Sequence, residues 1–580
     1  MKLGIPLRLI GRISKWQLVV TLLSGVGTCA PWTSGTDSLG AVSSESRLCS
    51  EIGIELLERG GNAADALVGT ALCVGVVGMQ HSGIGGGGFM LVRGPDGKYE
   101  SIDYRETAPA AAHRDMYKDN VLGSVWSGLA SGVPSDLRGL EYLHNKYGVL
   151  PWRAVCNPAV HVARYGFPVT EDLVWYMNAA MSFNNGSNPF LTEDPSWAVD
   201  FAPNGTLLGL DETLTRKRYA NTLETIAKYG AGAFYEGEIA NYTIAAIQAQ
   251  NGTMTLEDLK NYAVSVREPI SIKYKGYNLH STGVPSGGGV ALSILKIMEG
   301  YNITDLNDIE EMALNTHRFD EAMRYAYAAR SELGDPDFFS YMVGLEAEML
   351  KSKTAAKTRE KILDDRTKNV TDYRPLPNSK QYFLPENHGT SHIVTSDASG
   401  LSISSTSTVN LLFGSQLVVP ETGVIMNNEM NDFSIPGVPN AFGFVPSPIN
   451  YIAPGKRPLS SISPIIVEHP NGTLYLSVGA AGGSRIITST AQTVWHVLDH
   501  EMMVPEALAA PRLHDQLMPA YTTFEKTFNK DVIEIMKEKG HNTSWAGVHD
   551  SAVQGVRRLW NGTFEAGSEP RQFNSGGLAV

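Results

Sequence analysis

The junction between Gly389 and Thr390 divides the chain into two parts with different sequence patterns. The segment from Asp364 to Gly389 has little apolar periodicity, which predicts an exposed linker where a processing site would be accessible. Beyond it, residues alternate with period two in Ile393–Ser396, Leu401–Thr408 and Thr473–Val478. Residues from about 130 to 260 read mainly as helices and loops. Strands flanked by helices in both parts of the chain predict an α+β fold, a layered αββα sandwich.

The same patterns predict further elements on both sides of the junction. Strands are expected at Phe89–Arg93 and Tyr99–Tyr104, and helices at Glu310–Leu333, Tyr341–Leu363, Ile486–His500 and Lys530–Lys539. The segment from Ser434 to Arg457 predicts a loop.

Thr390 is a candidate nucleophile because of where it stands. A threonine hydroxyl is a poor nucleophile unless a base is adjacent, and the residue's own α-amino group, with a pKa of roughly 7.7–8.0, is such a base once the preceding peptide bond is cut. Gly389 has no side chain to obstruct attack by the Thr390 hydroxyl on the carbonyl before it. A Gly-Thr dipeptide alone is weak evidence for a nucleophile, so the assignment depends on the surrounding motifs.

Six sequence blocks support the functional interpretation. Four follow Thr390, and they are Ser404–Asn410, Asn427–Ser434, Pro458–Ser461 and Val478–Ser484. Two precede it, and they are Gly83–Met90 and Asp103–Pro109. Together they resemble γ-glutamyltransferases (glutathione hydrolases), a family of N-terminal-nucleophile hydrolases, from about Leu39 to the C-terminus.

The resemblance implies a precursor that cleaves itself between Gly389 and Thr390. A large subunit, 31–389, and a small subunit, 390–580, would then build one four-layer sandwich as a heterodimer. The length of 580 residues suggests three or four domains, but the resemblance implies one composite domain.

The resemblance also assigns catalytic roles to residues that have simpler interpretations. Thr390 would be the nucleophile, and Thr408 would hydrogen-bond to it, although a β-branched residue filling a strand is the simpler reading of Thr408. Gly482 and Gly483 would present backbone N–H groups to the oxyanion, although they also suit an ordinary tight turn.

Substrate-binding roles follow in the same way. Arg105 would bind the α-carboxylate of a glutamyl group, and Ser460 and Ser461 would add donors. Glu429, Asp432 and Asn410 would receive the α-ammonium. Read alone, Arg105 beside Glu106 suggests a surface ion pair, and Glu429 with Asp432 a solvated turn.

The reaction implied is cleavage of the γ-glutamyl amide bond of glutathione and related compounds through an acyl-enzyme. Water, an amino acid or a dipeptide would accept the glutamyl group, and no cofactor is implied. Phe442, Phe444 and the turn Pro446–Pro448 could shape access for the acceptor. Two rivals remain: an acylase for glutaryl-like side chains, and an uncleaved, inactive secreted binding protein.

Other candidate sites fail on their context. Gly83–Gly88 satisfies a GxGxxG pattern, but it follows a helix and enters a strand, the reverse of a dinucleotide site. His388 and His392 flank Thr390, and His392 is expected to make hydrogen bonds rather than act as the base. No His/Cys/Asp cluster has metal-ligand spacing, so no metal site is expected.

The N-terminus predicts entry into the secretory pathway. Basic residues precede the short apolar run Leu18–Val26, and small residues follow, so 1–30 resembles a signal peptide, with an uncleaved membrane anchor as the alternative. The product would be secreted or lumenal (extracellular or vacuolar). The net charge of −13 argues against a nucleic-acid partner. Nine glycosylation sequons agree with this route: Asn185, Asn204, Asn241, Asn251, Asn302, Asn369, Asn471, Asn542 and Asn561.

Two cysteines are placed to form a disulfide bond. Ser44–Arg59 and Ala63–Met79 both predict helices, separated by Gly60-Gly-Asn62, so an antiparallel hairpin would bring Cys49 opposite Cys73. Two buried free thiols are the alternative. Cys156 would be an unpaired buried thiol.

Overall fold

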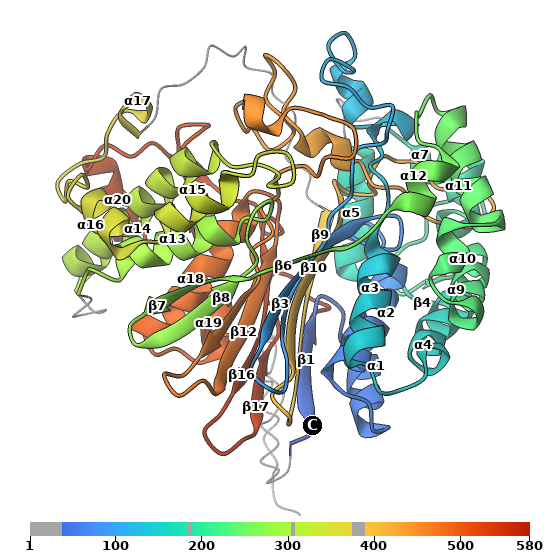
Figure 1. The fold of residues 1–580 in the computed structure, drawn as a ribbon, viewed down its shortest axis with the longest axis horizontal. Coiled ribbons are helices and arrows are strands. Elements are labelled where there is room, and N and C mark those ends of the chain that lie inside the picture. Colours follow the sequence, from blue (N-terminus) through green and yellow to red (C-terminus); the bar gives the residue numbers. More distant parts are fainter. Residues whose placement is uncertain (1–37, 183–187, 303–307, 374–388) are drawn as a thin grey trace, which may run out of the picture. The chain divides into compact units, whose positions relative to one another are not determined.

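Two large β-sheets lie face to face in the computed structural model, which describes residues 38–182, 188–302, 308–373 and 389–580 (Figure 1). The expected signal peptide, Asn185 and most of the expected linker lie outside these residues. The first sheet has the order β18 (Gly576–Ala579), β1 (Gly40–Ser44), β9 (Gly389–Asp397), β10 (Ser402–Asn410), β2 (Gly87–Arg93), β3 (Tyr99–Tyr104) and β6 (Ser265–Arg267). The second has the order β17 (Phe564–Gly567), β16 (Ala552–Arg558), β12 (Leu474–Ala481), β11 (Ile465–Glu468), β8 (Tyr277–Ser281) and β7 (Ile270–Tyr274).

Helices cover the outer face of each sheet. α1 (Arg47–Glu58) and α2 (Ala63–Val77) pack on the first sheet, and α13 (Gly288–Met298) and α18 (Arg485–Asp499) pack on the second (Figure 1). The predicted αββα sandwich is therefore confirmed. Both sheets mix strands from before and after Thr390.

The remaining elements extend these layers. The helices are α3 (Asp136–Tyr147), α4 (Trp152–Tyr165), α5 (Glu171–Met181), α7 (Phe190–Glu193), α8 (Pro195–Phe201), α9 (Lys217–Tyr229), α10 (Gly232–Tyr235), α11 (Glu238–Ala249), α12 (Leu256–Asn261), α14 (Ile309–Arg330), α15 (Met342–Met349), α16 (Ser352–Arg359), α17 (Val370–Tyr373), α19 (Val504–Ala509) and α20 (Lys530–Glu538). The small strands are β4 (Phe167–Pro168), β5 (Thr213–Leu214), β13 (Leu513–His514), β14 (Thr522–Phe524) and β15 (Thr543–Trp545).

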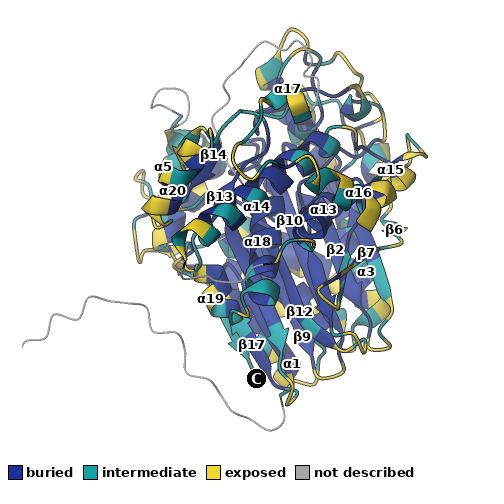
Figure 2. Ribbon diagram, turned by 90° about the vertical axis from the view of Figure 1, so that its left-hand side faces the viewer, coloured by how far each residue is buried: buried dark blue, intermediate teal, exposed yellow. Residues whose placement is uncertain are grey.

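Strand β9 is buried on both faces, and its side chains alternate between two environments. Val394 packs between the sheets with Leu91 and Ile466, whereas Ile393 packs in the core under the helices of the first sheet. Because the side-chain period of a strand is two, Thr390 shares the inter-sheet face of Val394. Burial of the strands between the helices is visible as the dark interior of Figure 2.

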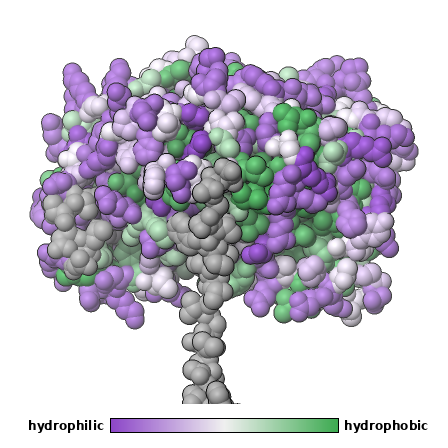
Figure 3. All heavy atoms as spheres, turned by 90° about the horizontal axis from the view of Figure 1, so that it is seen from below, coloured by the Kyte–Doolittle hydropathy of each residue, from purple (hydrophilic) through white to green (hydrophobic). Residues whose placement is uncertain are grey.

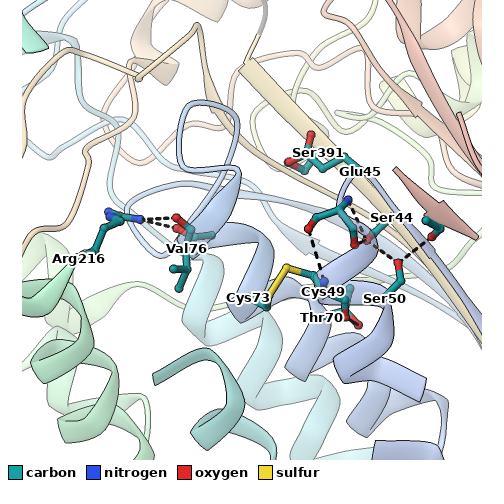
Figure 4. The surroundings of a disulfide bond; sticks show 12 residues. Ser44, Glu45, Cys49, Ser50, Thr70, Cys73, Val76, Arg216 and Ser391 are labelled. Carbon is teal, nitrogen blue, oxygen red and sulfur yellow. Dashed lines mark hydrogen bonds between the residues drawn. A yellow bond between two sulfur atoms is a disulfide. The ribbon is translucent and has the colours of Figure 1, made fainter. Parts of the chain in front are cut away.

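The hairpin of α1 and α2 contains the predicted disulfide bond. Cys49 and Cys73 are bonded, with their Cα atoms 5.4 Å apart (Figure 4). Asn62 caps α2 and forms a capping box with Asp65, which stops the turn from continuing α1 as one helix. Cys156 is a buried free thiol, as expected, and burial raises its pKa.

Most predicted helices are found within a few residues of their expected bounds, but Tyr341–Leu363 is not one helix. It divides into α15 and α16, with Lys351 in an extended conformation between them. The break lets Arg359 donate to the carbonyl oxygens of Lys296 and Ile297 at the end of α13, 3.1 and 2.9 Å away. These carbonyl groups have no partner within their own helix, so a local sequence pattern could not predict the break.

The sequence predicts an exposed linker up to Gly389, and this prediction is wrong for the peptide bond between Gly389 and Thr390. Gly389 and Thr390 are both buried in β9, and Thr390 is 7% exposed. A protease could not reach this peptide bond without unfolding the strand. Burial therefore favours cleavage from within the chain.

The sequon asparagines are accessible at the surface. All eight sequon asparagines in the described residues are exposed. Hydrophilic side chains cover much of the face seen in Figure 3, with hydrophobic ones in patches between them. Within the described ranges, we find no helix that combines the length and apolarity needed to cross a membrane.

The disulfide bond should contribute measurably to stability. Replacing both Cys49 and Cys73 with Ala frees a loop with a sequence separation of 24, and we expect a loss of about 3 kcal/mol, read as a lower thermal unfolding temperature. In the denatured wild-type protein, alkylation should label two more thiols after reduction than before. An unchanged count would contradict the bond, and Cys156→Ala is the control for loss of a buried cysteine.

Candidate active site

A small cavity brings together most of the residues that the sequence motifs singled out. Its lining consists of Arg105, Thr390, Thr408, Asn410, Glu429, Asp432, Phe442, Ser460, Ser461, Ile462, Gly483 and Ile486. These residues come from both sheets and from loops on both sides of the junction. Of the expected catalytic and substrate-binding residues, only Gly482 does not line it.

The Thr390 hydroxyl is held by a hydrogen-bond arrangement with only one consistent direction. β9 and β10 pair with Thr390 opposite Thr408, and the two hydroxyl oxygens are 3.0 Å apart. Thr408 Oγ1 lies 2.5 Å from the Gly389 carbonyl oxygen, which can only accept, so Thr408 donates there. Thr390 must then donate to Thr408, which leaves the lone pairs of Thr390 Oγ1 free. Thr408 thus polarises the carbonyl that precedes the nucleophile.

A bulge in β10 fixes Thr408 in this role. The register of β9 and β10 shifts between Thr408 and Asn410, and Asn410 has a φ of 77°. The shift turns the Asn410 N–H toward Thr408 Oγ1, at 2.7 Å. Gly389 fits because a Cβ there would approach the Leu411 carbonyl oxygen to 2.5 Å. A side chain before Thr390 would therefore disturb the strand pairing that holds the two hydroxyl groups together.

Arg105 follows β3 and lies at the acidic end of the cavity. Its guanidinium is 1% exposed and forms ion pairs with Glu429 through Nη1 and with Asp432 through Nη2. Both acids stand on the short 3₁₀ helix Glu429–Asp432. The surface ion pair and the solvated turn that a local reading suggests are therefore both wrong.

Acidic groups outnumber basic groups around Arg105. Glu106 is fully buried with its carboxylate 4.0 Å from Arg105, so three carboxyl groups surround one guanidinium. Burial raises the pKa of Glu106 to about 8, and burial also raises the pKa of Glu429 and of Asp432 although Arg105 opposes both shifts. Such a cluster favours a bound cation. Glu106 was missed as a site residue because its motif position suggested only a partner for Arg105.

A second buried arginine, Arg330, was also missed. It ends α14 and donates to Ser461 Oγ at 3.2 Å, and its guanidinium lies 4.0 Å from the Phe444 ring centre. Burial lowers its pKa to about 10. A predicted helix end carries no motif, so no signal in the sequence marked Arg330.

The turn after β12 places Gly483 at the cavity. Gly482 and Gly483 have φ values of 128° and 56°, and α18 begins at Arg485. A Cβ on Gly482 would overlap the Asp550 carbonyl oxygen. Gly483 therefore lines the cavity just before the N-terminus of α18, a position where unpaired backbone N–H groups can stabilise an anion. Tyr327 of α14 supports the turn by donating to the Ser484 carbonyl oxygen.

His392 shares the face of Thr390 but is held by other partners. Its Nδ1 lies 2.7 Å from Thr406 Oγ1 and its Nε2 lies 3.1 Å from Ser404 Oγ. Burial lowers its pKa to about 3, so it is neutral in solution near pH 7. The hydrogen-bonding role predicted for His392 is confirmed.

The glycine-rich block Gly83–Gly88 packs protein against protein. It connects α2 to β2, the order that argued against a dinucleotide site. A Cβ on Gly85, Gly86 or Gly88 would overlap the carbonyl oxygen of Ile425, Thr408 or Thr406, in that order. These glycines therefore let β2 approach β10 closely at the level of Thr408.

Comparisons with known proteins agree with this arrangement. The sequence profile of the gamma-glutamyltranspeptidase family matches residues 49–578. The chain is 50% identical to "Glutathione hydrolase proenzyme" from Arthroderma benhamiae over 97% of its length and 98% of that protein, and 46% identical to "Glutathione hydrolase" from Aspergillus flavus over 93% and 90%. Its fold matches a crystal structure of cephalosporin acylase from Bacillus halodurans, with a TM-score of 0.81, 26% identity and coverage of 96% and 98%.

The buried Glu106 carboxyl group should make stability depend on pH. Its pKa is about 8 in the folded chain and near 4.5 otherwise, so its stabilising contribution is complete below pH 4.5 and is lost as pH rises through 8. We expect Glu106→Gln to gain thermal stability relative to the wild type by up to about 1.4 kcal/mol per pH unit across this window. Unfolding temperatures between pH 5 and pH 8.5 measure the effect. Glu58→Gln, at an exposed position in α1, should show no such trend, and a constant difference for Glu106→Gln would contradict the prediction.

Proposed function

The chain belongs to the gamma-glutamyltranspeptidase family, and from this premise we propose that Thr390 is the nucleophile of a γ-glutamyl transferase and glutathione hydrolase. The observation that carries the proposal is the chain of hydroxyl groups from Thr390 through Thr408 to the Gly389 carbonyl oxygen. It presents a hydroxyl lone pair beside a polarised carbonyl. The same hydroxyl faces a cavity with charged groups for an amino acid.

Maturation is the first reaction of Thr390. Its Oγ1 attacks the Gly389 carbonyl carbon, the peptide C–N bond breaks, the hydroxyl proton passes to the nitrogen, and an ester remains. Water then hydrolyses the ester. The products are a large subunit, 31–389, and a small subunit, 390–580, whose new α-amino group is the base for catalysis. Because strands of both parts pair with one another in both sheets, the two chains stay together as one composite domain.

The charged end of the cavity suits the α-carbon of a γ-glutamyl substrate. Arg105 binds the α-carboxylate, aided by Ser460 and Ser461. Glu429 and Asp432 receive the α-ammonium, together with Asn410, whose own amide N–H donates to the Asn428 carbonyl oxygen at 3.0 Å. The substrate ammonium supplies the positive charge that the three carboxyl groups favour.

Acyl transfer follows from this placement. Thr390 Oγ1 attacks the γ-carbonyl carbon, its proton passes to the α-amino group of Thr390 and then to the leaving amine, and a glutamyl ester forms. The turn at Gly482 and Gly483 stabilises the oxyanion through backbone N–H groups. Water, an amino acid or a dipeptide then attacks the ester and restores the hydroxyl.

A second cavity adjoins the first and shares Asp432 and Phe442 with it. Tyr327, Arg330 and Phe444 line it, along with residues of the loop Ser434–Arg457. We assign the leaving peptide or the amino acid acceptor to this cavity, because it joins the first cavity at Asp432 and Phe442.

The cellular route is the secretory pathway, by way of a signal peptide or an N-terminal anchor in 1–30. Two features support it: the Cys49–Cys73 disulfide bond, which forms in oxidising compartments, and the exposure of the eight described sequon asparagines. The protein would be a secreted or lumenal glycoprotein.

Self-cleavage is tested by the intact mass of the deglycosylated, denatured and reduced protein. We expect two chains in the wild type, the smaller beginning at Thr390, and one uncut chain in Thr390→Ala. Thr408→Val should slow cleavage because the Gly389 carbonyl loses its donor. Ser391→Ala is the matched control, since its hydroxyl lies on the opposite face of β9 and bonds Glu45. One uncut chain in the wild type would instead support a non-enzymatic binding protein.

Substrate choice separates the proposal from a glutaryl acylase, a rival favoured by the fold match to cephalosporin acylase. The test compares γ-glutamyl-p-nitroanilide with glutaryl-p-nitroanilide, which lacks only the α-amino group. We expect kcat/KM to favour the γ-glutamyl compound by about 10³-fold, because the glutaryl group leaves Glu429 and Asp432 without their cation. In the double variant Glu429→Gln, Asp432→Asn, the ratio of kcat/KM for the γ-glutamyl compound to that for the glutaryl compound should fall toward 1. Equal rates in the wild type would support the acylase.

A further inference from the structure

A buried cluster of His317, Glu321 and His541 lies outside both cavities. His317 and Glu321 are one turn apart on α14, and His541 follows α20, a pair of elements near one another in Figure 1. One ligand atom from each residue lies within 4.8 Å of the other two, and none of the three residues is more than 3% exposed.

A hydrogen bond fixes the imidazole proton of His317, and a carboxylate lies beside the imidazole of His541. His317 Nε2 lies 2.8 Å from the Leu363 carbonyl oxygen, which can only accept, so Nε2 carries a proton. His541 Nδ1 lies 3.0 Å from Asp320 Oδ2, and this carboxylate favours a proton on Nδ1. In the neutral imidazoles, the other two nitrogens therefore carry lone pairs.

Those two nitrogens, His317 Nδ1 and His541 Nε2, lie 2.7 Å apart, the distance of a hydrogen bond, and would have to separate to about 3.3 Å to bind one tetrahedral metal ion. Two lone pairs at 2.7 Å repel unless a positive charge lies between them. The choices are an added proton, which makes one ring an imidazolium, or a metal ion.

Glu321 distinguishes the two choices. Its Oε1 accepts from the hydroxyl groups of Thr367 and Tyr373, at 2.7 and 2.6 Å. Its Oε2 has no hydrogen-bond partner within the part of the chain that the structure describes, although the residue is fully buried. A proton between the histidines leaves this oxygen without a partner, whereas a cation can bind it as well.

We propose that His317 Nδ1, His541 Nε2 and the Glu321 carboxylate bind a zinc ion. Two imidazoles and a carboxylate suit this metal, and the outer contacts with Leu363 and Asp320 are the kind that orient metal-binding histidines. The ion joins α14 to the segment after α20. Since α14 also carries Tyr327 and Arg330, the site holds in place the helix that supports the active-site turn.

The test is the zinc content of the purified full-length protein after growth with added zinc and exchange into metal-free buffer. We expect a metal-to-protein ratio of about 1 in the wild type and below about 0.1 in His541→Gln and in Glu321→Gln. His500→Gln is the matched control, because His496 and His500 face each other at 3.1 Å without a third ligand in the described residues. It should retain the zinc.

X-ray absorption on the wild type keeps the proposal testable if a variant does not fold. We expect two imidazole nitrogens and carboxylate oxygen at about 2.0–2.2 Å from zinc. Folded wild-type protein that holds no zinc after equilibration with zinc chloride would overturn the proposal and assign a proton to the histidine pair. Full zinc retention in His541→Gln would overturn it too.

Discussion

The pairing of β9 with β10 is the constraint on which the rest of the site depends. It sets Thr390 opposite Thr408, and the bulge at Asn410 then turns a backbone donor onto the Thr408 hydroxyl. With that donor in place, Thr408 is free to donate only to the Gly389 carbonyl oxygen. One backbone register therefore determines the direction of every hydrogen bond around the nucleophile. A slip of one residue would turn Thr390 away from the cavity.

The acidic cluster around Arg105 has a cost that the fold must offset. Buried carboxyl groups are stable only when they are paired or protonated, and Glu106, Glu429 and Asp432 share one close guanidinium. A chain without a use for these groups would gain stability by losing them. Their arrangement is therefore best explained by a ligand that brings its own positive charge, and this distinguishes an amino-acid-like substrate from a simple diacid.

The sequence predicted those features that depend on local residue patterns or on short motifs. Alternation predicted the strands around Thr390, and the motif blocks contained eight of the twelve residues that line the cavity. Three features of the structure were not predicted because they depend on residues far apart in the sequence. Arg330 is placed by the packing of α14, the break at Lys351 serves the end of another helix, and His541 lies 224 positions from His317. Burial of the junction escaped too, since the polar residues before it predict exposure while β1 and β10 enclose it.

Both sheets also explain how a chain could be cut beside its nucleophile without losing its fold. β9 has β1 on one side and β10 on the other, and in the second sheet β11 pairs with β8. Breaking the bond before Thr390 removes no strand from either sheet, so the inter-sheet core stays buried. What the cut changes is local: the first residue of the new chain gains an amine while its hydroxyl remains beside Thr408. The fold thus converts a buried peptide bond into a catalytic base at the one position where the hydroxyl is already held.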